Sequence, residues 1–272
     1  MIPRQFPRMV VAETRKVFTS GSAIAAITIA VLVAIGAVFG VWQWGHMRDS
    51  FSASVNGQET VSNFTSSGEY VAGWALWARN FFLLPLFLLL ATAGSVAGEL
   101  GERTLRELVV RPVPRWSILA AKMLALCALS VATLVVTLVL SLGLGSAFFG
   151  LDAAGGSLSS LLLGYAASFL SDVGLISLTM LASMLVSSVG GVVVAMLLLL
   201  ILDFGLGLLL KLLGAVGVEQ AALVVPYTLG NALGAWNGFE KGWDPVQFGA
   251  LGVYVVVSAV FAVARFHRMD VP

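Results

Sequence analysis

The sequence predicts an all-α polytopic membrane protein, and three observations lead to this fold class. Of the 272 residues, 59% are hydrophobic and only 11% are charged, whereas roughly a quarter of a soluble domain is charged. The mean hydropathy is +0.98, and several apolar runs reach the ~20 residues that a helix needs to cross a bilayer. These runs are continuous, without the alternation of apolar and polar residues that a membrane β-barrel requires.

Six apolar segments are long enough to cross a membrane as helices. The predicted spans are 22–41, 74–97, 118–145, 158–186, 190–213 and 246–264. The second span contains Pro85, and the single cysteine, Cys127, lies in the third. One cysteine allows neither a disulfide framework nor a metal site with cysteine spacing. We therefore expect one transmembrane domain over residues 1–272, with no bound metal.

The first 20 residues precede these spans and predict a helix in the membrane interface. Apolar Val10 and Val17 interleave with the basic residues Arg15 and Lys16, a pattern in which apolar side chains enter the bilayer and charges stay near the headgroups. The alternative is a basic tail that only sets topology. The following span, 22–41, is longer than a signal-peptide core, and we expect it to remain uncleaved.

The distribution of basic residues orients the spans. An even number of spans places both termini and the loop after the second span on the same side. That side and its edge hold eleven lysines and arginines, and the other holds four. The eleven are Arg4, Arg8, Arg15, Lys16, Arg103, Arg106, Arg111, Arg115, Lys122, Arg265 and Arg268. The four are Arg48, Arg79, Lys211 and Lys241. By the positive-inside rule, both termini are predicted to be cytoplasmic.

The outer segment 214–245 is too apolar for a plain loop. We expect short helices that enter the outer leaflet and break around Pro226 and Gly230. Irregular backbone at that depth must be covered by neighbouring helices.

The most charged stretch is the loop 98–115, between the second and third spans. Glu99 and Glu102 stand four residues before Arg103 and Arg106, the favourable order for ion pairs along a helix. The prolines of "RPVPR" then end the predicted helix. A plain connector that only holds topology is the alternative, but helix connections in bundles usually need 2–8 residues. The length and stiffness of this loop favour contact with a cytoplasmic partner.

The stretch "AGELGERTLRELVVRPVPRWSILAAKMLA" resembles the conserved segment of type-2 ATP-binding-cassette (ABC) exporter permeases, E-x-x-x-G-T-L-E-x-L-x-x-x-P-V-S-R-x-x-I-x-x-x-K. The matching residues are Glu99, Thr104, Leu105, Leu108, Pro112, Val113, Arg115, Ile118 and Lys122. Arg103, Arg106 and Pro114 depart from the pattern. The close match covers about 30 residues.

The resemblance implies a permease subunit of an ATP-driven exporter in a bacterial inner membrane, with 98–115 as a cytoplasmic coupling helix. The residues it assigns to contact with the ATPase are Glu99, Glu102, Arg103, Thr104, Leu105, Leu108, Arg111, Pro112, Pro114 and Arg115. The implied partners are two copies of a separate ATPase, which would bind ATP and magnesium, and a second permease chain. The chain itself has no G-x-x-x-x-G-K-[ST] phosphate loop, so we expect it to be no enzyme and the ATPase activity to lie in the partner. We also expect no cofactor bound by this chain and no nucleic-acid partner.

Two acidic residues lie inside predicted spans. Carboxylates in a membrane are costly and are candidates for function, so Asp172 and Asp203 are candidates for a translocation path or a dimer seam. We expect Ser168, Ser171 or Ser177 to hydrogen-bond Asp172. The alternative is that each acid is buried and satisfied by a hydroxyl or a lysine of a neighbouring helix.

Two other functions remain open at this point. An ion-driven secondary transporter would use Asp172 and Asp203, but it usually carries internal repeats with paired broken helices, and no such repeat is evident in the sequence. A non-transporting membrane scaffold is the second. The sequence does not identify a transported substrate.

Overall fold

The computed structural model describes residues 5–52, 67–81, 83–102, 114–150, 156–234 and 244–268. Within these ranges the chain forms helices and no strand. Six helical segments have the length and apolar composition needed to cross a membrane. The predicted multi-pass, all-α membrane architecture is therefore confirmed.

The N-terminal helix α1 (Phe6–Phe18) is amphipathic and has a proline in its first turn, where the missing N–H costs no helical hydrogen bond. It buries Val17 and packs along α7. A short turn leads to α2 (Gly21–Ser52), the first membrane-spanning helix.

The second span differs from the single helix predicted over 74–97. The chain instead forms α3 (Gly68–Phe81) and α4 (Leu83–Ala93), then a π-helix, η1 (Gly94–Gly98), and the short α5 (Glu99–Gly101). Pro85 accounts for the new start at α4, because a proline is tolerated in the first turn of a helix but not in its interior. The π-helix places an irregular turn directly before Glu99, and π-turns within helices are often found at functional sites.

The centre of the bundle is built from α7 (Arg115–Phe149) and α8 (Gly156–Leu185). At 35 residues, α7 is about 50 Å long, so it extends beyond the hydrocarbon core. It packs closely on α3 because two glycines face each other: a Cβ atom on Gly145 would lie 3.0 Å from the Cα of Gly68.

The C-terminal part contains α9 (Val189–Ala215), the short helices α10 (Glu219–Val224), η2 (Val225–Tyr227) and α11 (Leu229–Leu233), and α13 (Pro245–Arg268). The outer segment predicted at 214–245 thus holds broken helices within its described part. Large apolar side chains cover much of α9 and α13 and remain exposed on this single chain.

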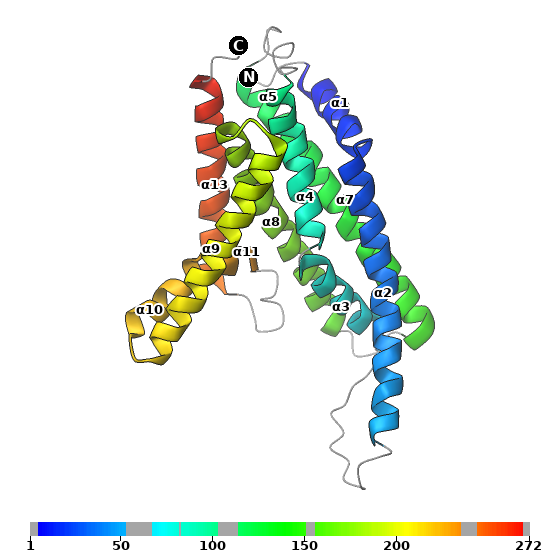
Figure 1. Cartoon of the computed structure of the whole chain (residues 1–272). Coiled ribbons are helices and arrows are strands. Elements are labelled where there is room, and N and C mark those ends of the chain that lie inside the picture. The colour runs from blue at the N-terminus through cyan, green and yellow to red at the C-terminus, as the bar shows by residue number, and fades with distance from the viewer. Residues whose placement is uncertain are drawn as a thin grey trace.

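The start of α1, the end of α13 and α5 lie together at one end of the bundle, and α10 lies at the other end (Figure 1). Two contacts fix the first arrangement. The Arg115 guanidinium donates to the carbonyl oxygen atoms of Phe266 and His267 at 3.1 and 3.2 Å, and the rings of Phe6 and Trp116 lie 6.3 Å apart. The starts of α1 and α7 and the ends of α5 and α13 therefore lie on the same side of the bundle.

Candidate functional site

An ion pair between Arg79 and Asp172 lies at the break in the second span. The Nη2 atom of Arg79 is 2.6 Å from Oδ2 of Asp172, and the side chains are 0% and 6% exposed. Arg79 is near the end of α3, and Asp172 is in the middle of α8. We call these two residues the central ion pair. The break in the helix thus coincides with a charge buried between spans.

Hydroxyl and amide groups complete the central ion pair. Ser130 of α7 donates to Oδ2 of Asp172 at 2.5 Å, and Thr133 accepts from Nη2 of Arg79 at 3.1 Å. Asn80 accepts from Nη1 of Arg79 at 2.6 Å and donates to Ser168 at 2.8 Å. The network joins α3, α7 and α8 through side chains alone.

The serines predicted to hydrogen-bond Asp172 do not do so, whereas the alternative, a buried acid with a hydroxyl partner on a neighbouring helix, is confirmed by Ser130. Ser168 accepts from Asn80, and the hydroxyls of Ser168, Ser171 and Ser177 donate to carbonyl groups of their own helix, α8. The carboxylate instead uses a serine of α7 and an arginine that the sequence analysis had placed at the outer edge. The signal for Arg79 was its position inside the predicted span 74–97, because an arginine at that depth needs a carboxylate or carbonyl partner.

Burying two charges is favourable only when each finds good partners, since both lose their hydration. The central ion pair has a short charged contact and added hydroxyl bonds. The Nε atom of Arg79, however, has no hydrogen-bond partner among the described residues. The arrangement therefore ties two spans together without satisfying every polar atom.

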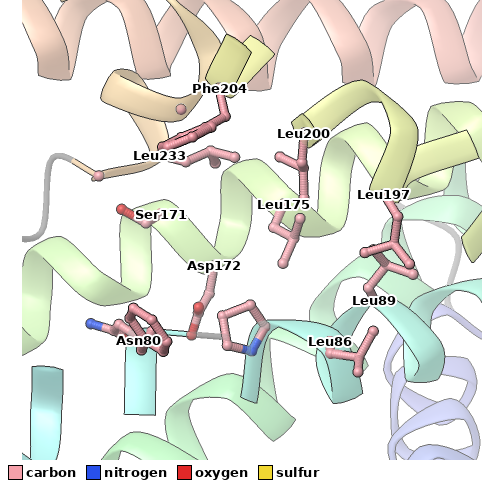
Figure 2. A pocket seen from close by; sticks show the side chains of 14 residues that line it. Asn80, Leu86, Leu89, Ser171, Asp172, Leu175, Leu197, Leu200, Phe204 and Leu233 are labelled. Atoms are coloured by element: carbon pink, nitrogen blue, oxygen red, sulfur yellow. The ribbon is translucent and has the colours of Figure 1, made fainter. Parts of the chain in front are cut away.

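A cavity of about 540 Å³ adjoins the central ion pair. Asn80 and Leu86 line it from the second span, Asp172 and Leu175 from α8, and Leu200 from α9. Figure 2 shows the Asp172 carboxylate reaching from α8 toward the segment that carries Asn80, while Phe204 and Leu233 form the facing wall. The site is a mostly apolar chamber with its polar groups at one wall.

Asp203 does not join the central ion pair. Its Oδ1 and Oδ2 atoms accept from the backbone N–H groups of Leu229 and Gly230 at 2.9 and 2.6 Å. These are the first residues of α11, whose N–H groups have no partner within the helix. A Cβ atom on Gly230 would lie 2.9 Å from Oδ2 of Asp203, so glycine at this position leaves room for the carboxylate. Asp203 thus anchors α11, in the broken outer segment, to α9. Its partners are backbone N–H groups, whereas the alternative in the sequence analysis named a hydroxyl or a lysine.

A second group of charges lies at the end of the bundle that carries both termini. The Lys122 ammonium is 2.7 Å from Oε1 of Glu99 and 3.0 Å from Oε2 of Glu13, and Lys16 is 2.6 Å from the same Glu99 oxygen. We call these four residues the end cluster. It joins α1, α5 and α7 around both ends of the loop 103–113.

The end cluster spans a range of burial. The side chain of Lys122 is 0% exposed and that of Lys16 is 61% exposed. Burial lowers the pKa of Lys16, but the hydrogen bond that Lys16 donates to Glu99 and the nearby carboxylates of Glu99, Glu13 and Glu102 raise it, so that the pKa lies above its ordinary value of 10.5.

Most of the residues assigned to contact with an ATPase lie outside the described residues. These are Arg103, Thr104, Leu105, Leu108, Arg111 and Pro112. Of the others, Glu99 is buried in the end cluster and Glu102 is exposed. Pro114 directly precedes α7, and Arg115 begins it and contacts α13. The predicted partners of Glu99 and Glu102 within the loop, Arg103 and Arg106, are likewise outside the described residues.

In the described part of the chain, no three histidine, cysteine, aspartate or glutamate side chains gather closely enough to hold a metal ion. The described residues offer a buried ion pair, a partly exposed charge cluster at another depth, and an apolar chamber beside the ion pair.

Comparison with known proteins gives a family and no activity. No curated protein matches the chain. A family model described as "Protein of unknown function (DUF2705)" matches residues 78–272, which include every span from the second half of the broken helix onward and both intramembrane acids. Because the match covers well over half of the sequence, the chain belongs to the DUF2705 family.

Proposed function

We propose that this chain is the membrane-spanning permease subunit of an ATP-driven exporter. The observation that carries the proposal is the bond between Glu99 and Lys122, at 2.7 Å. These two residues are the first and last matches to the permease segment in the sequence. Their contact joins the helix that precedes the loop 103–113 to the helix that follows it, and Glu13 and Lys16 link both residues to α1.

The contacts of the end cluster would transmit a force on the loop to the membrane-spanning helices. Glu99 follows the π-helix at the end of the second span, and Lys122 is in the second turn of α7. A partner that pushed on the loop would therefore move α1, α5 and α7 together. The same second span carries Arg79 at its break, beside the chamber. A separate ATPase that closes on ATP is the partner that the permease resemblance implies.

The two intramembrane acids support this proposal over an ion-driven carrier. A carrier that moves protons or sodium needs a carboxylate that exchanges its ion during transport. Asp172 is paired with Arg79 and Ser130, and Asp203 with two backbone N–H groups. Both carboxylates thus have protein partners even when no transported ion is bound.

Co-purification tests the proposal directly. The chain, tagged at its C-terminus and extracted in mild detergent from its native host, is expected to bring down a stoichiometric subunit with vanadate-sensitive ATPase activity. Leu105→Asp with Leu108→Asp should abolish this association, because charge would replace the apolar residues of the proposed contact.

The matched control is Val216→Asp. Val216 is 84% exposed and follows α9 at the opposite end of the bundle, so this variant should retain the ATPase. A wild-type chain that purifies alone, without ATPase activity, would overturn the proposed function and return attention to the ion-driven carrier.

A further inference from the structure

The chamber beside the central ion pair has the size and composition of a ligand site. Its volume is about 540 Å³, and binding cavities for small molecules generally measure about 300–1,000 Å³, with mostly apolar walls and a few placed polar groups. Leu86, Leu175 and Leu200 supply apolar wall from three different helices, and Asn80, Ser171 and Asp172 supply the polar wall. Such a chamber suits a molecule with an apolar body and one polar end.

The donors and acceptors that remain on the polar wall decide which polar head of a ligand fits the chamber. The Ser171 hydroxyl already donates to the carbonyl of Ala167 at 3.3 Å, and the Asn80 amide already donates to Ser168. A carboxylate has no hydrogen to donate. The carboxylate of Asp172 and the hydroxyl oxygen of Ser171 can each accept a further hydrogen bond, and the Asn80 amide keeps one N–H to donate. A ligand head that mainly donates hydrogen bonds therefore fits this wall.

Charge points in the same direction. Arg79 balances Asp172, but the carboxylate lines the chamber and the guanidinium does not. An anionic head would therefore meet a carboxylate in a medium of low dielectric, where repulsion between like charges is strong. An amine head would be attracted to the same carboxylate.

Two aromatic side chains indicate how a ligand enters. Phe81 and Phe204 line the chamber, and each is 73% exposed on this chain. They belong to α3 and α9, so the chamber opens between two membrane-spanning segments. An apolar molecule dissolved in the bilayer can reach it sideways, without crossing water.

We infer that this chamber binds an amphiphile from the bilayer, with an apolar body among the leucines and a hydrogen-bond-donating amine head at Asp172, Asn80 and Ser171. The inference deepens the proposed function, because in an exporter this molecule belongs to the class of transported substrates. Binding itself requires only the permease chain.

The experiment uses the full-length chain in lipid nanodiscs and a pair of photoreactive probes. One probe is dodecylamine that carries a diazirine on its chain, and the other is the matched dodecanoic acid. After illumination, labelled residues are mapped by mass spectrometry. The amine is expected to label wall residues of α8 and α9, to be displaced by unmodified dodecylamine, and to exceed the acid at the same positions.

Leu200→Trp fills the chamber and should reduce labelling by the amine about tenfold, a loss that corresponds to one decade in affinity. The matched control is Leu202→Trp, on the same helix, where the native side chain is 70% exposed and does not line the chamber; it should label like the wild type. Ser171→Val serves as a second variant, since it removes one acceptor and leaves the central ion pair intact. It should weaken the amine and not the acid.

Equal labelling by the two probes, or labelling that Leu200→Trp and Ser171→Val leave unchanged, would overturn the inference. Labelling that instead joins the chain to a second copy at Phe204 would show that a protein partner closes the chamber, and would also overturn it. Because no ATPase is needed here, amine-selective binding to a chain that purifies alone would retain the site and reject the exporter.

Discussion

The central ion pair and the end cluster both join cations and carboxylates from different helices, yet they differ in their access to water. Arg79 and Asp172 are buried together between α3 and α8. The end cluster begins with buried Lys122 and ends with Lys16, which is mostly exposed. Water and dissolved salt screen the attraction between exposed charges, so the exposed contacts of the end cluster are weak. The comparison therefore separates a pair that holds the bundle together from a cluster that can rearrange at its edge.

The largest effect is expected from breaking the central ion pair. Arg79→Met should lower the free energy of unfolding by about 3–5 kcal/mol, because it leaves the carboxylate of Asp172 buried without its counter-charge. Unfolding by sodium dodecyl sulfate in mixed micelles measures this loss. The double variant Arg79→Met with Asp172→Leu should recover most of it, because two apolar side chains then replace two charges. A double variant as unstable as the single one would mean that the pair is not the source of the stability.

A smaller effect is expected in the end cluster. Glu99→Gln should lower the free energy of unfolding by about 1–3 kcal/mol, because Lys122 loses the charged oxygen at 2.7 Å and retains only Glu13. Under the proposed function, Glu99→Gln should also reduce the activity of the associated ATPase subunit, and by more than the loss of stability explains.

The control for this variant is Glu102→Gln. Glu102 is exposed at the end of α5, and surface charges contribute little. If the two glutamine variants have the same unfolding midpoint, the buried hydrogen bond that Lys122 donates to Glu99 does not stabilise the protein.

The third effect concerns Asp203, a carboxylate whose partners among the described residues are backbone N–H groups and not a cation. Asp203→Asn should cost about 1 kcal/mol, because the asparagine amide keeps one acceptor oxygen and replaces the other by an NH2 group, so that one of the two hydrogen bonds is lost. It should raise hydrogen exchange at the amides of Leu229 and Gly230. Asp244→Asn is the matched control, since Asp244 accepts from the amide of Val246 at the start of α13. Its exchange should rise at Val246 and not at Leu229. Unchanged exchange at Leu229 in Asp203→Asn would contradict the anchoring of α11.

The smallest effect concerns pH. Because the pKa of Lys16 is raised above 10.5 by its carboxylate partners, its contribution to stability is fully present below pH 10.5 and is lost as the pH rises above that value. Lys16→Met should remove this part of the pH dependence, measured as the unfolding midpoint between pH 9 and pH 12, values that bracket an ordinary lysine pKa of about 10.4. Identical pH profiles for the two proteins would place the alkaline sensitivity elsewhere.

The sequence by itself determined the fold class. Continuous apolar runs cannot be solvated by water, and a membrane helix must satisfy its own backbone hydrogen bonds, so composition and run length together predicted six spanning helices. The amphipathic pattern of residues 6–18 likewise predicted α1. The break between α3 and α4 had a local signal in Pro85, although a proline inside an apolar run indicates a kink as readily as a new helix start.

The sequence predicted only part of the site, namely the two acids but not their partners. Asp172 and Asp203 were candidates because a carboxylate in an apolar run is costly wherever it lies. Their partners come from distant positions: Arg79 is 93 residues from Asp172, and Leu229 is 26 residues from Asp203. Helical periodicity describes neighbours within one helix, three or four residues apart, and carries no information about which helices meet.

Only the tertiary structure decided which charges are paired and where space remains. Glu99 was assigned to contact with an ATPase and placed four residues before Arg103, but its buried partner, Lys122, lies 23 residues along the chain, on α7. The chamber needs walls from the second span, α8, α9 and the α11 region at once. Burial and volume are properties of the packed helices together, and for that physical reason no single segment of the sequence could predict them.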